Sequence, residues 1–215
     1  MEHRIIAVIP AYNEKNTITS VVKNTLKYTD NIIVVNDCST DDTSNLAKEA
    51  GAIVINNTKN KGYDKSINKG FEKAKEIGAT IIITLDADGQ HKTEDIPKLI
   101  NPIKNGNYDV VVGIRPYKQR IAEHIYAKIS KKRGNMLDPL CGLKAYSIKA
   151  YNATGYFDKL NSIGTELMFN SYKKGFKIKQ IPITIEKRED NSRFGNKIKG
   201  NYKILKAIIN ITKNI

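Results

Sequence analysis

Two carboxylates and an amide stand at the end of an apolar run near the middle of the chain. Asp86 and Asp88 follow the run Thr80–Leu85, and Gln90 comes two residues later. If the run is a β-strand, residues two apart point to the same side, so the carboxylates converge, and a turn at Gly89 lets Gln90 bring a third oxygen. Hard oxygen ligands suit Mg²⁺ or Mn²⁺, which usually keep open positions for substrate phosphates. A polar strand end with a solvated turn is the alternative explanation.

Length and composition predict one globular domain without a disulfide framework. The 215 residues can bury one substantial core, and 40% of them are hydrophobic and 27% charged. Cys38 and Cys141 are too few and too far apart for a disulfide framework, so we expect reduced thiols. No apolar stretch approaches the roughly 20 residues that span a bilayer, and no signal peptide precedes Arg4. We therefore expect a cytoplasmic protein.

The second half of the chain carries the whole net charge of +14. Residues 1–107 contain 14 basic and 14 acidic side chains, whereas residues 108–215 contain 22 basic and 8 acidic ones. A neutral half beside a basic half indicates an anionic partner: a membrane surface, a nucleic acid or a phosphorylated substrate. Compositional drift towards lysine and asparagine is the alternative, although drift should affect both halves.

Apolar runs alternate with amphipathic segments through the first half. The pattern predicts strands at 5–9, 32–35, 53–55, 81–85 and 110–114, with helices at 17–28, 39–50, 65–77 and 94–104. Strands that are apolar throughout and separated by helices predict an α/β fold, with a mainly parallel sheet covered by helices on both faces. In such sheets ligands bind beyond the carboxyl ends of the strands. No glycine-rich phosphate loop is present at those ends.

The alternation fails after about residue 115. A helix is predicted at 119–132, a loop leading into a short strand at 138–146, a helix at 165–174 and a strand at 177–185. In the tail from Lys197 to Ile215, one helical face carries Ile204, Ile208, Ile211 and Ile215, and lysines stand elsewhere. A basic amphipathic helix of this kind either lies at a membrane interface or caps the domain core.

Four motifs, in this order, resemble those of family 2 glycosyltransferases, which have the GT-A fold. They are Pro10–Glu14, Asn36–Asp42, Asn60–Gly62 and Asp86–His91. The resemblance covers nearly the whole chain and is closest to synthases that join a hexose from a nucleotide sugar to dolichyl or polyprenyl phosphate. It implies one catalytic domain: a nucleotide-sugar and metal half at 1–115, an acceptor half at 116–195 and a basic amphipathic helix at 196–215.

The resemblance also implies the residues of the donor side. The nucleotide-sugar contacts would be Pro10, Ala11, Tyr12, Glu14, Asp37, Asp86 and Ala87. Asp37 would take the base, and Asp86 the ribose and diphosphate side. Asp88 and Gln90 would hold Mg²⁺ or Mn²⁺ against the diphosphate, which neutralises the charge that builds on the leaving group. We expect His91 to support this site rather than to bind the metal.

Basic residues of the second half would contact the acceptor phosphate. Arg115 ends a strand and Arg133 lies within Ser130–Asn135, and both segments resemble arginine elements of the family. Arginine suits this role because its planar fork binds phosphate oxygens through two nitrogens. The residues implied as catalytic are Asp88, Arg115, Arg133 and Asp138. The implied acceptor-phosphate set is Arg115, Arg133, Lys144, Arg188, Arg193 and Lys197.

Two of these segments depart from the family pattern. Asp138–Lys144 resembles an acceptor loop whose usual form is Asp-x-x-Ser-Gly-Phe-Arg, but cysteine, leucine and lysine replace the serine, phenylalanine and arginine. The position survives, and a hydroxyl contact is lost. The segment from Arg188 to Lys197 resembles a closing basic loop without its serine. The identity of the acceptor therefore depends on other features.

The choice of acceptor decides whether a catalytic base is needed. A phosphate monoester has a second pKa of about 6 and is already a nucleophile at neutral pH, whereas a sugar hydroxyl needs a positioned carboxylate. Glycan-extending relatives use an acidic pair where this chain has Glu166 followed by Leu167. The missing acid and the clustered cations favour polyprenyl phosphate, reached by peripheral contact with an anionic membrane surface or through a separate membrane protein.

Two other functions remain open at this point. One is transfer to a glycan or protein hydroxyl with Glu166 as the base. The other is a basic nucleic-acid-binding protein, although no nucleic-acid motif is present and the carboxylate-rich first half has no role in it.

Overall fold

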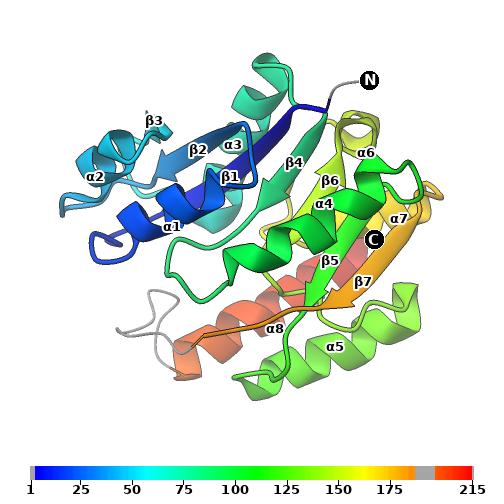
Figure 1. The fold of residues 1–215 in the computed structure, drawn as a ribbon. Helices are drawn as coiled ribbons and strands as arrows, with labels where there is room; N and C mark the ends of the chain where they lie inside the picture. Colours follow the sequence, from blue (N-terminus) through cyan, green and yellow to red (C-terminus); the bar gives the residue numbers. More distant parts are fainter. Residues whose placement is uncertain (1–2, 187–196, 215) are drawn as a thin grey trace.

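The computed structural model describes residues 3–186 and 197–214, and these contain a seven-stranded sheet in the order β3-β2-β1-β4-β6-β5-β7 (Figure 1). The strands are β1 (Ile5–Ala11), β2 (Asn31–Asn36), β3 (Ile53–Asn56), β4 (Ile81–Thr84), β5 (Val110–Ile114), β6 (Lys144–Ser147) and β7 (Ile178–Pro182). The helices are α1 (Ile18–Thr25), α2 (Thr43–Glu49), α3 (Tyr63–Glu76), α4 (Ile96–Lys104), α5 (Ile121–Gly134), α6 (Ile148–Thr154), α7 (Glu166–Lys173) and α8 (Lys197–Asn214).

The sheet is mainly parallel, as the sequence predicts. Strands β3, β2, β1 and β4 pair in parallel, and so do β5 and β7. Strand β6 runs antiparallel between β4 and β5, a position that the sequence pattern did not predict. Its register pairs Lys144 with Thr84, and the Thr84 hydroxyl donates a hydrogen bond of 2.7 Å to the carbonyl of Gly142. The segment before β6 therefore lies beside the end of β4, where the acidic cluster begins.

Helices cover both faces of the sheet because successive strand residues point to opposite sides. In β1, Ile5, Ala7 and Ile9 join the core under α1, α2 and α4, whereas Ile6 and Val8 join the core under α3, α5 and α8. Helix α3 lies close to β1: a Cβ atom on Gly70 would sit 2.2 Å from Cγ1 of Val8. This close approach packs the middle of α3 tightly against the middle of β1.

Several element boundaries differ from those the sequence predicts. Helix α5 begins and ends two residues later than predicted, and the regular part of β7 ends at Pro182 rather than at residue 185. Helix α6 was not predicted. A short 3₁₀ turn, Thr93–Asp95, precedes α4. Apart from α6 and the 3₁₀ turn, these differences lie at element ends, where terminal residues are the least determined by apolar periodicity.

Helix α8 caps one core. Its residues Ile204, Ile208 and Ile211 are buried and belong to the core under α3 and α5. This burial accounts for the apolar face that the sequence predicts. No helix within 3–186 or 197–214 is long and apolar enough to cross a membrane.

Candidate functional site

A cleft of about 750 Å³ opens at the carboxyl ends of β1, β2 and β4. Ten residues that the sequence assigns to the nucleotide sugar, the metal or the acceptor line it: Pro10, Ala11, Tyr12, Glu14, Asp37, Asp86, Ala87, Asp88, Gln90 and Arg115. They come from four separate strand ends or the turns that follow them. The structure therefore brings together most of the predicted site.

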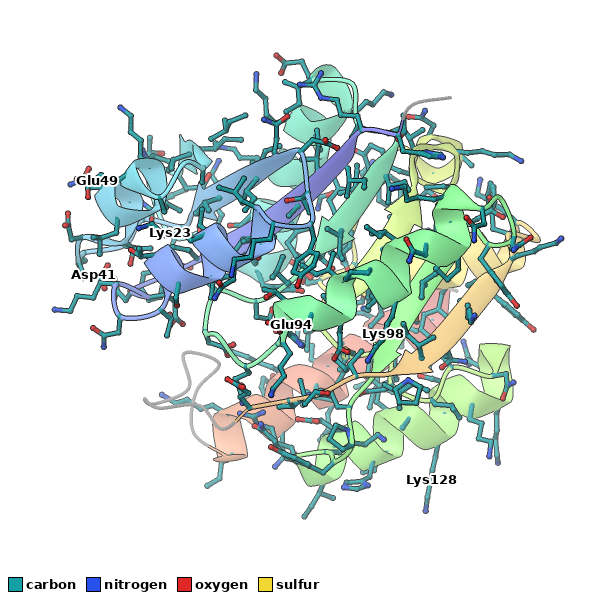
Figure 2. The ribbon with its side chains drawn as sticks, viewed as in Figure 1. Lys23, Asp41, Glu49, Glu94, Lys98 and Lys128 are labelled. Carbon is teal, nitrogen blue, oxygen red and sulfur yellow. The ribbon has the colours of Figure 1, made fainter. Side chains whose placement is uncertain are left out.

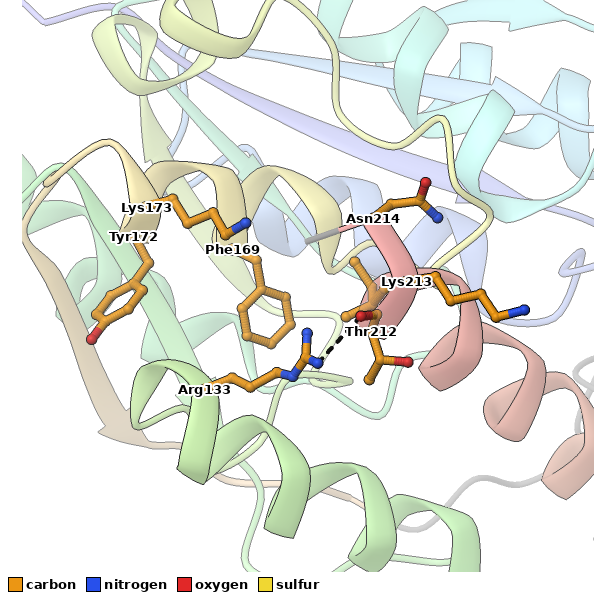
Figure 3. Close-up of a pocket in the computed structure, with 8 residues that line it drawn as sticks. Arg133, Phe169, Tyr172, Lys173, Thr212, Lys213 and Asn214 are labelled. Atoms are coloured by element: carbon orange, nitrogen blue, oxygen red, sulfur yellow. Dashed lines mark hydrogen bonds between the residues drawn. The ribbon is translucent and has the colours of Figure 1, made fainter.

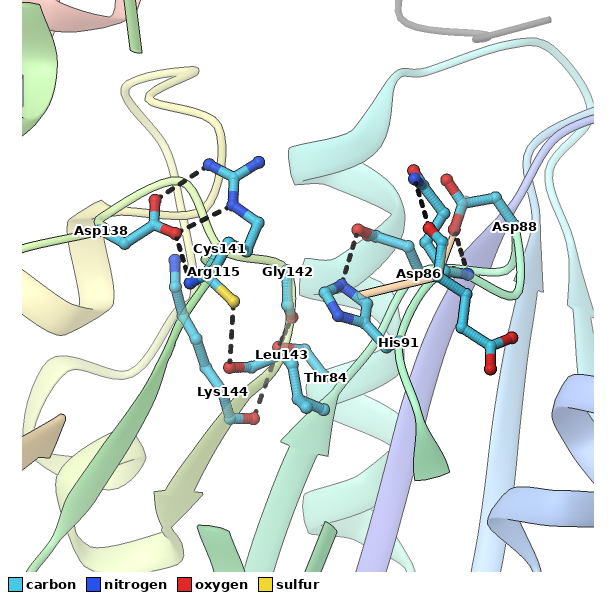
Figure 4. A network of polar contacts seen from close by, with 12 residues as sticks. Thr84, Asp86, Asp88, His91, Arg115, Asp138, Cys141, Gly142, Leu143 and Lys144 are labelled. Atoms are coloured by element: carbon cyan, nitrogen blue, oxygen red, sulfur yellow. Dashed lines mark hydrogen bonds and ion pairs between the residues drawn. The ribbon is translucent and has the colours of Figure 1, made fainter. Parts of the chain in front are cut away.

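The acidic turn after β4 presents Asp86 to the cleft. The Asp86 side chain is 36% exposed, and its Oδ2 lies 3.2 Å from Nε2 of the buried His91 (Figure 4). Burial raises the pKa of Asp86, but the hydrogen bond from His91 and the positive charges of Arg115 and Lys144 outweigh that effect, so the pKa lies below its usual value. Asp86 is therefore ionised at neutral pH, and His91 orients it.

Asp88 and Gln90 are joined within the same turn. The backbone N–H of Gln90 donates to Oδ1 of Asp88 at 3.1 Å. The turn is also joined to the segment after β7 by two hydrogen bonds. The side-chain amide of Gln90 donates to the backbone carbonyl of Glu186 at 3.2 Å, and the backbone N–H of Glu186 donates to the backbone carbonyl of Gln90 at 2.9 Å. These contacts hold the metal-binding candidates in place at the rim of the cleft.

The donor set of this turn fits a hard divalent cation. Carboxylates of Asp86 and Asp88 and the amide of Gln90 all line one cleft, and oxygen ligands of this type suit Mg²⁺ or Mn²⁺. Among the described residues, no group of three or more His, Cys, Asp or Glu side chains could enclose a metal ion. A cation here would therefore need further oxygens from a ligand, as Mg²⁺ takes from nucleotide phosphates.

Gly142 packs directly behind Asp86. A Cβ atom at this position would lie 2.3 Å from Oδ2 of Asp86, which is far inside van der Waals contact. Only glycine allows the segment before β6 to approach the carboxylate so closely. The glycine of the predicted acceptor loop thus shapes the acidic side of the cleft.

At the other end of the cleft, the Asp37 carboxylate binds backbone N–H groups of the segment before α3. Its carboxylate accepts hydrogen bonds of 2.8 Å from the N–H groups of Lys61 and Gly62 and from the side chain of Asn57. Asn60 and Gly62 line the cleft. Asp37 therefore builds the edge formed by the Asn60–Gly62 motif, in addition to lining the cleft itself.

Arg115 is fixed by a buried carboxylate. Its Nε and Nη2 donate to the two oxygens of Asp138, each at 2.9 Å, and Asp138 is 1% exposed (Figure 4). Glu123 accepts a further bond of 3.1 Å from Nη2 and one of 3.3 Å from Arg120. Although burial opposes its charge, the contacts with Asp138 and Glu123 raise the pKa of Arg115, so it stays cationic. Among the described residues, Nη1 of Arg115 has no hydrogen-bond partner.

Arg133 lies elsewhere, which corrects its assignment to the acceptor site. It donates to the carbonyl of Thr212 at 3.2 Å and lines a separate cavity of about 370 Å³ between the ends of α5, α7 and α8 (Figure 3). Its position follows from helix length: Arg120 lies at the start of α5, beside the cleft, and 13 residues of helix carry Arg133 roughly 20 Å along the axis.

Lys144 is also misplaced by the sequence interpretation. Because β6 lies inside the sheet, its side chain is buried, and Nζ donates to the carbonyl of Gly164 at 2.7 Å. Burial lowers the pKa of Lys144 to about 8.

Arg188 and Arg193 fall outside the described residues, and Lys197 is the first residue of α8. The cysteines are free thiols, and burial raises the pKa of Cys141 to about 12.

The cleft contains residues that sequence reasoning missed. They are Tyr63, Asp64, Ser66, Gln119, Arg120, Glu123, Leu140, Asn161, Ile163, Lys203, Ile204 and Lys206. The spacing of Lys203 and Lys206, three residues apart on the basic tail, could have indicated that both reach the cleft. The position of Arg120 in the basic half of the chain is a weaker indication of the same kind. Nothing in the sequence indicates that Asn161 and Ile163 reach the same cleft as Asp86.

Glu166, the base in the alternative with a hydroxyl acceptor, is engaged with the backbone. It is 3% exposed, and its Oε2 accepts hydrogen bonds from the N–H groups of Lys159 at 2.7 Å and Leu160 at 2.9 Å. It is absent from the residues that line the cleft. Its role in this geometry is to fix the loop before α7.

Comparisons with known proteins agree with this geometry. The family model for glycosyl transferase family 2 matches residues 6–180. The chain is 30% identical to the UDP-N-acetylglucosamine–dolichyl-phosphate N-acetylglucosaminyltransferase of Methanococcus voltae, over 95% of this chain and 94% of that protein. It is 31% identical to the dolichol-phosphate mannosyltransferase of Pyrococcus furiosus, over 98% of this chain and 64% of that protein.

A solved structure shares the fold. Glucosyl-3-phosphoglycerate synthase from Mycobacterium tuberculosis, in complex with Mn²⁺ and uridine-diphosphate-glucose, has a TM-score of 0.73 and 21% sequence identity, covering 89% of this chain and 73% of that chain. At this identity the likeness establishes the GT-A fold alone.

Proposed function

Because the chain belongs to glycosyl transferase family 2, we propose that it moves a hexose from a nucleotide sugar to polyprenyl phosphate in a metal-dependent, inverting reaction. The observation that carries the proposal is the two-sided cleft. An acidic turn with hard oxygen ligands forms one side, and Arg115, Arg120, Lys203 and Lys206 contribute positive charge to the other. Such a site suits a metal-bound diphosphate next to a second phosphate. The names of the relatives support the lipid acceptor.

Each side of the cleft has a defined task in the proposed reaction. Pro10–Glu14 and the edge held by Asp37 bind the nucleoside, and Asp86 orients the ribose and diphosphate side. Asp88 and Gln90 would hold Mg²⁺ or Mn²⁺, which when bound would stabilise the charge on the departing diphosphate. Arg115, oriented by Asp138, positions the acceptor phosphate through its Nη1 group. The phosphate is already ionised at neutral pH and needs no base.

We expect Glu166→Gln to keep sugar transfer within about twofold of the wild type, because glutamine retains the oxygen that accepts the two backbone hydrogen bonds. The measurement is the initial rate of transfer to polyprenyl phosphate. A loss of about 100-fold or more would identify Glu166 as a general base and favour a hydroxyl acceptor.

A second apolar face of α8 supports peripheral membrane contact. Ile198, Tyr202, Leu205 and Ile209 recur at helical spacing and are 80%, 68%, 42% and 51% exposed, on the side away from the buried isoleucines. Helix α5 lies next to this face, since the N–H of Ala122 donates to the Asn201 side chain at 3.0 Å. We call the exposed side chains Ile121, Ile125, Ile198, Tyr202, Leu205 and Ile209 the α5–α8 face.

Positive charges border the α5–α8 face. Lys199, Lys203 and Lys206 recur at helical spacing along α8. Lys128 projects from α5 away from the sheet (Figure 2). An apolar stripe with a basic flank suits the interface of an anionic bilayer. Lys203 and Lys206 also line the cleft, so a bilayer on this face would bring lipid phosphates to the basic side of the site.

We expect the pair of substitutions Tyr202→Glu and Leu205→Glu to lower binding to vesicles containing phosphatidylglycerol by at least about tenfold, since each removes a large apolar contact and adds repulsion. Co-sedimentation with vesicles measures the effect. Leu137→Glu is the matched control: Leu137 is 38% exposed, but it lies beside β7, where its N–H donates to Gln180. Equal binding by the pair variant and the wild type would exclude this face.

The donor half of the proposal is tested by ligand-dependent thermal stabilisation. We expect UDP or GDP to raise the melting temperature in the presence of Mn²⁺ or Mg²⁺ and to lose this effect when EDTA removes the metal. The nucleotide that gives the larger shift identifies the donor class. No shift with either nucleotide would contradict the proposal.

A further inference from the structure

The loop between α6 and α7 has an unusual backbone where it reaches the cleft. Asn161, Ile163 and Gly164 have φ angles of 53°, 59° and 67°, in the left-handed region. For a β-branched residue such as Ile163 this conformation is a genuine outlier, which the surrounding structure must enforce. Asn161 and Ile163 line the cleft. The strained part of the loop is therefore the part that lines the cleft.

Two buried carboxylates enforce this conformation. Asp64, near the start of α3, accepts hydrogen bonds from the N–H groups of Ile163 at 3.3 Å and Gly164 at 2.7 Å. Asp158 accepts a second bond from the same Gly164 N–H at 3.1 Å and is also bonded to the backbone and hydroxyl of Ser162. The loop is thus clamped to α3 by two acids that meet at one N–H group.

The clamped segment lies beside the metal side of the cleft. A Cβ atom on Gly164 would lie 3.1 Å from Cε1 of Tyr63, and the Gly164 carbonyl accepts a hydrogen bond of 2.7 Å from Nζ of Lys144. Lys144 lies two residues after Gly142, which packs against Asp86. The nucleoside candidates Pro10–Glu14 come from the end of β1, a different element. In a nucleotide sugar the hexose follows the diphosphate, so it would extend past Asp86 towards this segment.

We propose that Asn161 and Ile163 form the wall that contacts the transferred hexose, and that Asp64 and Asp158 are positioning residues that hold this wall in its strained conformation. The inference rests on the proposed function. The Asn161 amide suits a sugar hydroxyl, and the Ile163 side chain suits the apolar face of a pyranose ring. Asp64 acts through the loop and does not take part in the chemistry.

The clamp has a pH dependence. Burial and the neighbouring charge of Asp158 raise the pKa of Asp64 to about 7. The other ionisable groups facing the pair are Glu166, the cation of Lys144, and the phenols of Tyr63, Tyr126, Tyr146 and Tyr156. Because the pKa of Asp64 is raised, the protonated form favours the folded clamp, and its stabilisation is lost as the pH rises through about 7.

The test compares the affinity for a nucleotide sugar with the affinity for the matching nucleotide diphosphate, both measured by calorimetry with Mn²⁺. We expect Asp64→Ala to weaken binding of the nucleotide sugar about tenfold and to leave nucleotide diphosphate binding within about twofold. Asp64→Asn keeps an acceptor oxygen and stays uncharged. It should bind like the wild type at about pH 6 and keep that affinity at about pH 8.5, where the wild type weakens.

Asn161→Gly covers the case in which Asp64→Ala does not fold. Asn161 is exposed and glycine accepts its left-handed conformation, so this variant should fold normally and still lose affinity for the nucleotide sugar alone. Wild-type protein that binds neither ligand would overturn the proposed function. Wild-type protein that binds both, with Asn161→Gly binding the nucleotide sugar equally well, would overturn the inference. The inference would also be overturned if the affinity of Asp64→Asn for the nucleotide sugar depended on pH in the same way as that of the wild type.

Discussion

We expect Asp88→Ala to lower kcat/KM for sugar transfer by on the order of 100-fold or more. The proposed metal stabilises a departing diphosphate, and such stabilisation is worth several kcal/mol in the transition state. Asp88 lines the cleft and receives the Gln90 N–H, so alanine removes both a candidate ligand and a contact that shapes the turn. Rates measured over a range of Mn²⁺ concentrations report the effect.

Glu94→Ala is the matched control for this loss. Glu94 is an exposed acid six residues further along, outside the residues that line the cleft, and its removal should leave the rate unchanged. Circular dichroism of both variants checks the fold. Retention of most of the activity by Asp88→Ala would remove Asp88 from the metal site.

Among the variants considered, we expect Asp138→Asn to lose the most stability, about 3–5 kcal/mol in the free energy of unfolding. Asp138 is buried and holds Nε, Nη2 and the backbone N–H of Arg115. Its replacement leaves a largely buried guanidinium whose one acidic partner among the described residues is Glu123. Urea unfolding monitored by circular dichroism measures the change.

Exposed Asp42 provides the comparison for Asp138. Asp42→Asn makes the same chemical change at the start of α2, where the side chain makes no capping hydrogen bond and accepts one bond from the Asn45 side chain that an asparagine oxygen can also accept. We therefore expect a change within about 0.5 kcal/mol. If Asp138→Asn and Asp42→Asn unfold at the same urea concentration as the wild type, the buried pair is not a stabilising element of the site.

The placement of the donor-side candidates could be predicted because it depends on local order. Apolar strands followed by polar turns place Pro10–Glu14, Asp37 and Asp86–Gln90 at one edge of a parallel sheet, whatever the details of packing. Among these residues, Pro10, Ala11, Tyr12, Glu14, Asp37, Asp86, Ala87, Asp88 and Gln90 line one cleft. The Asp86–His91 contact also follows from a short turn, since five residues separate the partners.

The basic side could not be predicted in the same way, because it depends on long-range pairing. The antiparallel insertion of β6 buries Lys144 and places Gly142 against Asp86. Arg133 shares a helix with the cleft residue Glu123, but ten residues of helix separate them. The partnership of Arg115 with Asp138 spans 23 residues and has no periodic signature. Charge counting indicated only the basic half of the chain. The individual cations came from the resemblance to the family, and of these Arg133 lines a separate cavity and Lys144 is buried.

The most direct test of the account offers the protein a matched pair of acceptors, polyprenyl phosphate and polyprenol, in vesicles with labelled UDP- and GDP-hexoses and Mn²⁺. We predict that label enters the lipid phase only with polyprenyl phosphate and is released from the product by mild acid, as expected of a glycosyl phosphate ester. Transfer to polyprenol at a comparable rate, or no transfer to polyprenyl phosphate from any UDP- or GDP-hexose, would contradict the account.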